Sequence, residues 1–174
     1  MTEIDHEHQL LLQVVNGVYG ADDLEGALRG IAHALQAAFP IWHASLWLHD
    51  ASHEVVSVIA SWSVADSAFA PGVEVSTGIT PPLARMLVDL HKGMTFGARM
   101  DDHGTSLLDS LMREEGVVEL MTVPLTRTAA RMPFLALGCS TEGGFGTAPP
   151  SFFLSLAAST AARLVTLATA PKQD

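Results

Sequence analysis

Histidine is the residue type in this sequence with the widest chemical use, and its spacing predicts no metal site. Eight histidines occur in the chain. His6 and His8 lie two residues apart on a predicted helix, so their side chains point to different sides of it. His43, His49 and His53 surround a predicted hairpin, but no His-Glu-x-x-His motif, Cys/His set or acidic triad accompanies them. We therefore expect solvated or capping roles for these side chains.

Nucleophilic and redox chemistry lack a supporting pattern as well. The single cysteine, Cys139, lies in a predicted strand, cannot form an intramolecular disulfide, and is expected to be a buried, inert thiol. No Gly-x-Ser-x-Gly turn marks a nucleophilic serine, and the glycine-rich stretch 143–146 lacks the Lys-Ser/Thr ending of a phosphate loop. The one candidate titratable set is Asp101, Asp102 and His103, which we interpret as a helix-capping loop. The sequence therefore predicts no enzyme.

Tryptophan and methionine side chains give the remaining hint of a binding site. Trp42, Trp47 and Trp62 lie on or beside the first predicted hairpin, and alternation places Trp47 on the face opposite Leu46 and Leu48. A group of methionines falls in the middle segment of the chain: Met86, Met94, Met100, Met112 and Met121. Methionine forms adaptable apolar walls, which suit a small-molecule pocket, although plain core packing is the alternative.

Composition and charge narrow the possible classes. Of the 174 residues, 48% are hydrophobic and 16% are charged, which is typical of one globular domain rather than a disordered chain. Nine basic against nineteen acidic residues give a net charge of −10, which disfavours direct nucleic-acid binding. The first residues carry no basic region and no apolar run looks long enough for a bilayer. We expect neither a signal peptide nor a transmembrane helix.

Two helices are predicted at the start of the chain. Apolar residues at helical spacing predict a helix over 4–19, which Gly20 ends. Asp22, with Glu25 three residues later, resembles a capping box and predicts the start of a second helix that runs to Phe39.

Two hairpins and a long final helix complete the pattern. Alternating residues predict strands at 43–49 and 54–62, and again at 116–125 and 132–140. Between the hairpins we expect a short strand at 73–75, a helix capped by Thr80 and ended by Gly93, an edge strand over 94–102 and a short helix over 107–113. Sequential antiparallel hairpins argue for an α+β domain whose terminal helices share one face of the sheet.

The final helix, predicted over 149–170, is apolar on all sides. Arg163 is its one charged residue. Such a helix must be covered on two sides, and the sheet supplies one cover. The second cover is either the N-terminal helix of the same subunit or a second subunit. We favour the second, a homodimer interface that contains both terminal helices.

The order of these motifs resembles a GAF domain, a sensory module of PAS-like architecture. The resemblance rests on Leu-Met-Thr-Val-Pro-Leu at 120–125, Phe-Leu-Ala-Leu-Gly at 134–138, Phe-Gly-Thr-Ala-Pro at 145–149, Gly78 with Leu-Ala-Arg at 83–85, and the stretch 93–101. It spans residues 22–168 of a single domain over 1–174, with a flanking helix over 1–20 and a tail over 171–174. Pro133 stands where the family usually has glycine, so the strand after the Val-Pro-Leu segment is expected to begin late or to lie irregularly.

The resemblance implies a central antiparallel sheet with the N- and C-terminal helices on one face and loops and short helices over the other. The implied pocket would be lined by Trp47, Trp62, Met86, Met94, Met100, Asp101, His103 and Met121. His91 or His103 would be the axial ligand if such a domain held haem. Cys139 does not match the cysteine that binds bilins in some relatives, and the cyclic-nucleotide signature is not found.

The implied function is that of a sensory or regulatory domain. It would bind a small, apolar effector and pass the signal through its terminal helices to an output domain or partner, in signal transduction or transcription control. It would be a cytoplasmic homodimer without direct nucleic-acid or membrane contact. Two alternatives remain open: a ligand-free dimerisation or protein-interaction module, and a small enzyme on the same fold.

Overall fold

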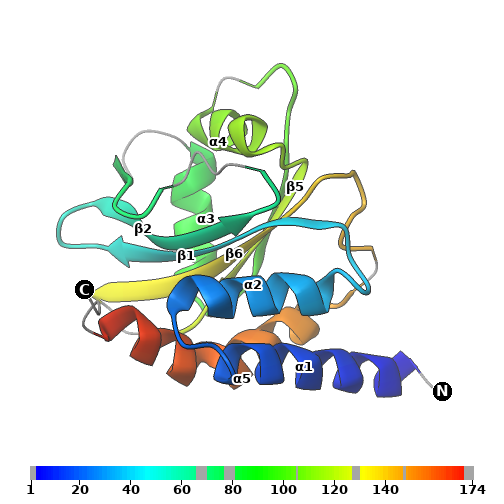
Figure 1. Ribbon diagram of the computed structural model, residues 1–174. Coiled ribbons are helices and arrows are strands. Elements are labelled where there is room, and N and C mark those ends of the chain that lie inside the picture. Colours follow the sequence, from blue (N-terminus) through cyan, green and yellow to red (C-terminus); the bar gives the residue numbers. More distant parts are fainter. Residues whose placement is uncertain are drawn as a thin grey trace.

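A six-stranded antiparallel sheet separates two groups of helices (Figure 1). The structure, a computed structural model, describes residues 3–65, 70–76, 81–104, 106–126, 130–146 and 148–170. The expected cap at Thr80 and the tail over 171–174 lie outside these ranges. The sheet order is β3 (Glu74–Ser76), β2 (Val55–Ser63), β1 (Ile41–Asp50), β6 (Arg131–Cys139), β5 (Glu119–Pro124) and β4 (Phe96–Arg99).

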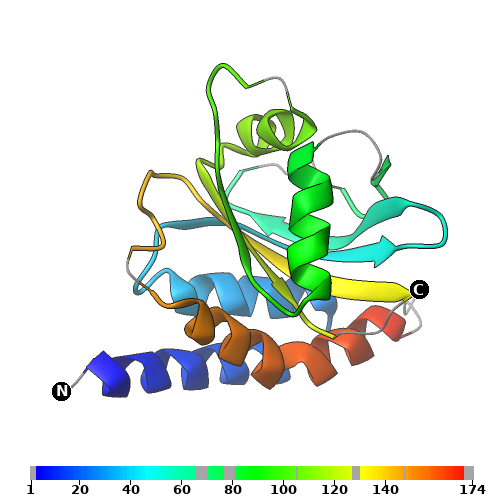
Figure 2. The same ribbon diagram turned by 180° about the vertical axis from the view of Figure 1, so that it is seen from behind.

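Both faces of the sheet are covered by helices, as Figure 2 shows from behind. One face carries α2 (Leu24–Leu35) and α5 (Pro150–Thr169), and α1 (Glu3–Tyr19) packs against both of these helices. The other face carries α3 (Pro81–His91) and α4 (Leu107–Glu115). The fold class is α+β, and the terminal helices share one face, as the sequence predicts.

The first two helices form where the apolar residues at helical spacing predict them, but the residue that caps the second helix differs from the prediction. Asp23, not Asp22, is the N-cap of α2: its Oδ1 accepts a hydrogen bond of 2.7 Å from the backbone N–H of Gly26. Asp23 has the extended backbone of a cap residue, which leaves its carboxylate free to reach the first turn. The helix also ends at Leu35, before the predicted Phe39.

Two glycines allow α1 and α2 to cross closely. A Cβ atom on Gly30 would lie 2.9 Å from the backbone carbon of Gly17, and one on Gly17 would lie 3.1 Å from the backbone of Gly30. Any larger side chain at this crossing would push the helices apart. The apolar residues around it, including Val14, Val18 and Ile31, are fully buried.

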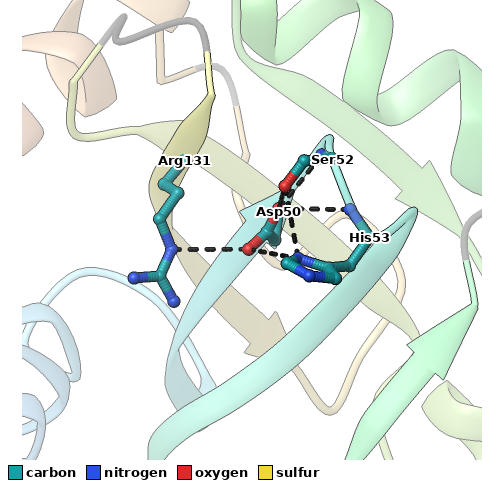
Figure 3. Close-up of polar contacts among 4 residues, drawn as sticks. All are labelled: Asp50, Ser52, His53 and Arg131. Atoms are coloured by element: carbon teal, nitrogen blue, oxygen red, sulfur yellow. Dashed lines mark hydrogen bonds and ion pairs between the residues drawn. The ribbon is translucent and has the colours of Figure 1, made fainter.

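The hairpin of β1 and β2 is closed by the carboxylate of Asp50, which Figure 3 shows at the turn. Its Oδ1 accepts hydrogen bonds from the N–H and hydroxyl of Ser52 and from the N–H of His53. Its Oδ2 lies 3.0 Å from Nδ1 of His53 and 3.5 Å from Nε of Arg131 on β6. These donors hold the pKa of Asp50 well below its usual range, chiefly through the hydroxyl of Ser52. The cluster ties the turn between β1 and β2 to the neighbouring strand β6.

Pro133 is accommodated inside β6, so the expected late or irregular start of that strand is wrong. The strand begins at Arg131, and Pro133 pairs with Leu48 of β1. Its carbonyl accepts a hydrogen bond of 3.0 Å from the N–H of Leu125, one residue beyond the end of β5. The proline nitrogen faces the same side, where β5 has already ended, so little of the ladder is lost.

The final helix presents one buried stripe and one partly exposed side. Phe153, Leu156, Thr160 and Leu164 are fully buried in the core between sheet and helices. Among the described residues, α5 is the one helix long and apolar enough to cross a membrane by length and composition, so the expectation that no apolar run reaches that length is wrong. Length and composition alone do not contradict the expectation that the chain has no transmembrane helix. Core helices share that composition, and α5 carries a buried stripe on one side.

Candidate functional site

A cavity lies between the second face of the sheet and the two helices α3 and α4. The cavity volume is about 50 Å³, and the space between atoms, counted out into the open mouth, is about 600 Å³. Strands β1, β2, β3, β5 and β6 supply one wall, and the helices supply the roof. The lining residues are His43, Ser45, Trp47, Val56, Val75, Leu83, Met86, Leu107, Leu108, Leu111, Met112, Glu115, Val117, Leu120, Thr122, Phe134 and Ala136.

Most of this wall is apolar, and its flattest part is aromatic. The rings of Trp47 and Phe134 stack with their centroids 6.1 Å apart and an interplanar angle of 14°. They come from the adjacent strands β1 and β6, where Trp47 and Phe134 are register partners. Met86 of α3 and Met112 of α4 close the cavity from the helical side. Such a wall suits an apolar, flat body.

One end of the cavity is polar, and β1 places its groups. His43, Ser45 and Trp47 alternate along the strand, so all three side chains project from one face. The hydroxyl of Ser45 lies 2.7 Å from Nε2 of His43 and accepts a hydrogen bond of 2.6 Å from Nε1 of Trp47. With its proton on Nδ1, the imidazole accepts the hydroxyl proton of Ser45 at Nε2.

The fourth polar group, Glu115, comes from the last turn of α4. Gly116 ends this helix in the left-handed conformation, with φ of 68°, which turns the chain back toward the sheet. Oε2 of Glu115 lies 3.1 Å from Nδ1 of His43, and both side chains are almost fully buried. A carboxylate and an imidazole at this depth must be compensated by each other and by nearby dipoles. Among the described lining residues there is no Lys or Arg.

The structure brings two of the eight sequence-predicted pocket residues to this cavity. Trp47 and Met86 line it. Met112, one of the five grouped methionines, lines it as well. Whether any of them contacts an effector stays a prediction.

The other six predicted residues do not line the cavity. Met121 and Trp62 pack on the opposite face, against the core of α1, α2 and α5. Met121 alternates with the lining residues Leu120 and Thr122.

Trp62 has the same parity as Val56 of the cavity wall, but the register shift of β2 between Val58 and Ala60 turns the end of the strand to the other face. Met94 follows α3 and is 52% exposed.

The remaining three follow β4. Met100 packs partly buried against Leu108 and Met112, outside the cavity. Asp101 and His103 are exposed.

The loop with Asp101 is hydrogen-bonded to the first turn of α4, but the N-cap of that helix is Ser106, so Asp101 itself is not the cap. Oδ1 of Asp101 accepts a hydrogen bond from the N–H of His103, and the N–H of Asp101 donates to the carboxylate of Asp109. Asp109 also binds the hydroxyl of Ser106, the N-cap of α4. These contacts lower the pKa of Asp109, with the Ser106 hydroxyl as the largest cause.

Three functional candidates were missed from the sequence: His43, Ser45 and Glu115. The sequence contains a signal for the first two. These polar residues alternate with Ala44 and Leu46 in a strand that the order of predicted elements places at the centre of the sheet. Alternation alone gives the shared face of His43 and Ser45. No spacing rule links either residue to Glu115, which reaches them only through the position of α4.

The remaining histidines and the cysteine lie away from the cavity. Nδ1 of His49, at the end of β1, lies 2.9 Å from Nε2 of His91, at the end of α3. Neither His91 nor His103 lines the cavity, so neither is placed to ligate a haem in it. No group of three potential metal ligands occurs in the part of the chain that the structure describes. Cys139 is buried on the opposite face, as expected.

Solved structures similar to this chain identify its fold, whereas comparison of its sequence identifies no family. No family model matches the chain, and no curated protein matches it. Among solved structures, the GAF domain of a phosphoenolpyruvate-protein phosphotransferase from Coxiella burnetii is similar with a TM-score of 0.68 and 18% identity, over 95% of this chain and 96% of that one.

Two further similar structures have bound molecules. One is the free methionine-R-sulfoxide reductase of Neisseria meningitidis in complex with its substrate, with a TM-score of 0.65, 15% identity, and 96% and 93% of the two chains covered. The other is a phycoerythrobilin-bound GAF domain from a cyanobacterial phytochrome, with a TM-score of 0.54, 12% identity, and 92% and 97% covered. The chain therefore has the fold of a GAF domain.

Proposed function

We propose that this chain is a sensory domain that binds a small, predominantly apolar effector in the cavity under α3 and α4. The observation that carries the proposal is an apolar cavity with a buried polar end made by His43, Ser45, Trp47 and Glu115. Proteins bury polar groups in this way at a cost, and ligand sites combine an apolar wall with a few convergent polar groups. Two of the similar structures hold a small molecule, which supports the same use of the fold.

The central strand offers a route from the cavity to the terminal helices. Ser45 and Trp47 of β1 face the cavity, while Ala44 and Leu46 of the same strand are buried against the helical layer on the other face. The cavity is narrow, so an effector would bind best to an arrangement in which α3 and α4 stand farther from the sheet. An effector shifts the population toward that arrangement only by the difference in its affinity for the two arrangements.

The proposed output runs through α1 and α5, with the domain acting as a cytoplasmic homodimer in signal transduction or transcription control. Leu12 and Tyr19 of α1 are 63% and 52% exposed, and Ala158 and Ala162 of α5 are exposed. Ala158→Glu would place a charge on this side without touching the core, and size-exclusion chromatography with light scattering would then report a monomer. Ala161 is unsuitable for this test because it packs on the core. A dimer unchanged by Ala158→Glu would contradict this interface.

Native mass spectrometry followed by a ligand screen tests effector binding. We expect an adduct of small mass on the purified protein, or thermal stabilisation by apolar members of a small-molecule panel. Ala136 lines the cavity, so Ala136→Leu fills it and should abolish the stabilisation. Ala136→Val is the milder version if the leucine variant does not fold. Stabilisation that survives in a folded Ala136 variant would contradict binding in this cavity.

One specific arrangement favours a second candidate, an acyl-transfer enzyme on the same fold. Ser45, His43 and Glu115 contact one another in the order hydroxyl, Nε2, Nδ1 and carboxylate, which is the order of a Ser–His–acid triad. Ser45 lies in the paired central strand, so a developing oxyanion would depend on a side-chain donor such as Nε1 of Trp47. Hydrolysis of p-nitrophenyl acetate that is lost in Ser45→Ala would support this candidate. An equal rate in both proteins would exclude Ser45 as the nucleophile.

A further inference from the structure

A groove distinct from the cavity runs between α3 and the edge strand β4. Its volume is about 610 Å³, against about 50 Å³ for the cavity. One side of α3 and the whole of β4 border it, and Figure 2 shows the two elements next to each other. The lining residues are Pro82, Arg85, Asp89, Thr95, Phe96, Gly97, Ala98 and Arg99. Exposed sheet edges are places where folded domains accept an extended peptide as a further strand.

We propose that this groove binds an extended, acidic peptide segment of a partner protein as an additional strand beside β4. The peptide backbone pairs with Gly97 and Arg99 of β4, and one of its carboxylates meets the guanidinium of Arg85 on α3. The groove lies outside the cavity to which the proposed function belongs, so a failure of either proposal leaves the other in place.

The register of β4 turns backbone groups toward the groove. The N–H of Met100 donates a hydrogen bond of 2.8 Å to the carbonyl of Val118, which makes these two residues a bonded pair of the antiparallel ladder. Bonded pairs alternate along such a ladder. Ala98 therefore bonds to β5 as well, whereas the N–H and C=O groups of Gly97 and Arg99 point away from β5. Since β4 is the last strand of the sheet in the described chain, these groups form a template for another strand.

The spacing of these groups selects an extended backbone as their partner. The outward groups of Gly97 and Arg99 repeat after two residues, which is about 7 Å along a strand. An extended peptide repeats its own N–H and C=O groups at the same interval. The stretch from Thr95 to Arg99 is about 13 Å long, so about four residues of a peptide fit beside it.

Arg85 sets the charge of the peptide. It is exposed on the groove side of α3, and it forms no ion pair with the residues that the structure describes. The other arginine of the groove, Arg99, is already bound by Glu119 and Glu142. Asp89, the one acid among the described lining residues, lies about one helical turn beyond Arg85. A carboxylate on the peptide therefore finds its counter-ion opposite Arg85 and is disfavoured at the end of the groove where Asp89 lies.

A phage library of random short peptides, selected on the full chain, is the probe. Selection at about 0.15 M salt screens the net charge of −10 over distances beyond about 8 Å. We expect the enriched peptides to share an acidic residue. Fluorescence polarisation with a labelled enriched peptide should show that Arg85→Gln weakens binding at least about threefold. Arg29→Gln on α2 is the matched control, because it removes the same charge from an exposed position outside the groove, and it should leave the affinity unchanged.

N-methylation of the same peptide tests strand pairing without altering the protein. In a strand beside β4, every second peptide N–H faces β4 and the others face away. Methylation of the amides that face β4 should weaken binding about tenfold or more, and methylation of the alternate set should leave it within about threefold. Equal losses from both sets would show that the peptide does not pair as a strand.

The remaining outcomes overturn the inference in distinguishable ways. If no peptide is enriched, the groove is not a peptide site, while effector binding in the cavity is unaffected. If Arg85→Gln binds as tightly as the wild type, or if Arg29→Gln weakens binding equally, the acidic class is wrong. Gly97→Pro removes one outward N–H and leaves the ladder to β5 intact. A dimer that this substitution converts to a monomer would assign the groove to a second copy of the chain instead of a peptide.

Discussion

Nδ1 of His43 lies 3.1 Å from Oε2 of Glu115, and the two side chains join the central strand β1 to the last turn of α4. Their exposed fractions are 3% and 1%, so water compensates neither group. Ser45 holds the other nitrogen of the imidazole at 2.7 Å. The pair therefore fixes the roof of the cavity to its floor at the place where the only buried acid among the described lining residues lies.

Removing one member of this pair should cost more stability than replacing both. We expect His43→Leu to lower the free energy of unfolding by about 3 kcal/mol, because the carboxylate of Glu115 then stays buried without the imidazole beside it. The double variant His43→Leu with Glu115→Leu should recover most of this loss, since no charge is left in the wall. Urea unfolding of the wild type, both single variants and the double variant measures the coupling. Strictly additive losses would show that the two side chains do not interact.

The close crossing of α1 and α2 makes a usually stabilising substitution harmful. Gly30→Ala raises helix propensity by about 1 kcal/mol, but its Cβ would lie 2.9 Å from the backbone of Gly17. Separating the helices should cost about 2 to 3 kcal/mol, so we expect a net loss of stability. Thermal unfolding measures it, and Gly17→Ala should behave alike. A raised melting temperature for Gly30→Ala would mean that the helices do not cross as described.

Acidification should weaken the contact between β1 and α3. Burial and the neighbouring His91 lower the pKa of His49, in that order, while Asp50 opposes them. Because the folded-state pKa lies below the unfolded value of 6.5, the unfolded state binds more protons as the pH falls through that value. The contribution of neutral His49 to the free energy of unfolding is therefore complete above about pH 6.5 and is lost as the pH falls below that value.

Urea midpoints measured across this pH range check the prediction. His49→Gln should flatten the pH dependence between about pH 7 and pH 5. His103→Gln is the control, because that side chain is exposed in a loop and should leave the profile unchanged. A profile that is equally steep in His49→Gln would assign the pH dependence to other groups.

The thiol of Cys139 should be unreactive in the folded protein. Burial, and secondarily the charge of Glu119, raises the pKa of Cys139 to about 12, so almost no thiolate is present at neutral pH. We expect no reaction with a thiol reagent such as dithionitrobenzoate in buffer and one equivalent of reaction after unfolding in guanidinium. Rapid labelling of the folded protein would contradict the placement of Cys139 in the core.

The fold class followed from local pattern to a large degree. The two hairpins, the edge strand, the helix over 81–91 and both terminal helices lie within a few residues of the predicted ranges. Alternation and helical spacing report directly which face of an element is buried, which explains this agreement. Two predictions from local sequence were wrong. Asp23 instead of Asp22 caps α2, and Pro133 lies inside β6. The place of Pro133 depends on where β5 ends, which the neighbouring sequence does not reveal, whereas the contact of Asp23 with Gly26 is local.

The candidate site likewise has one part that the sequence determines and one part that only the tertiary structure decides. The sequence alone determines that His43, Ser45 and Trp47 share one face of a strand, because the side-chain period of a strand is two. Only the tertiary structure decides that this face borders the cavity while Trp62 and Met121 lie on the other side of the sheet. Both faces are apolar and covered by helices, so hydrophobicity cannot distinguish them. Glu115 joins the site through the packing of α4 across the sheet, a long-range contact that residue types and spacing do not encode.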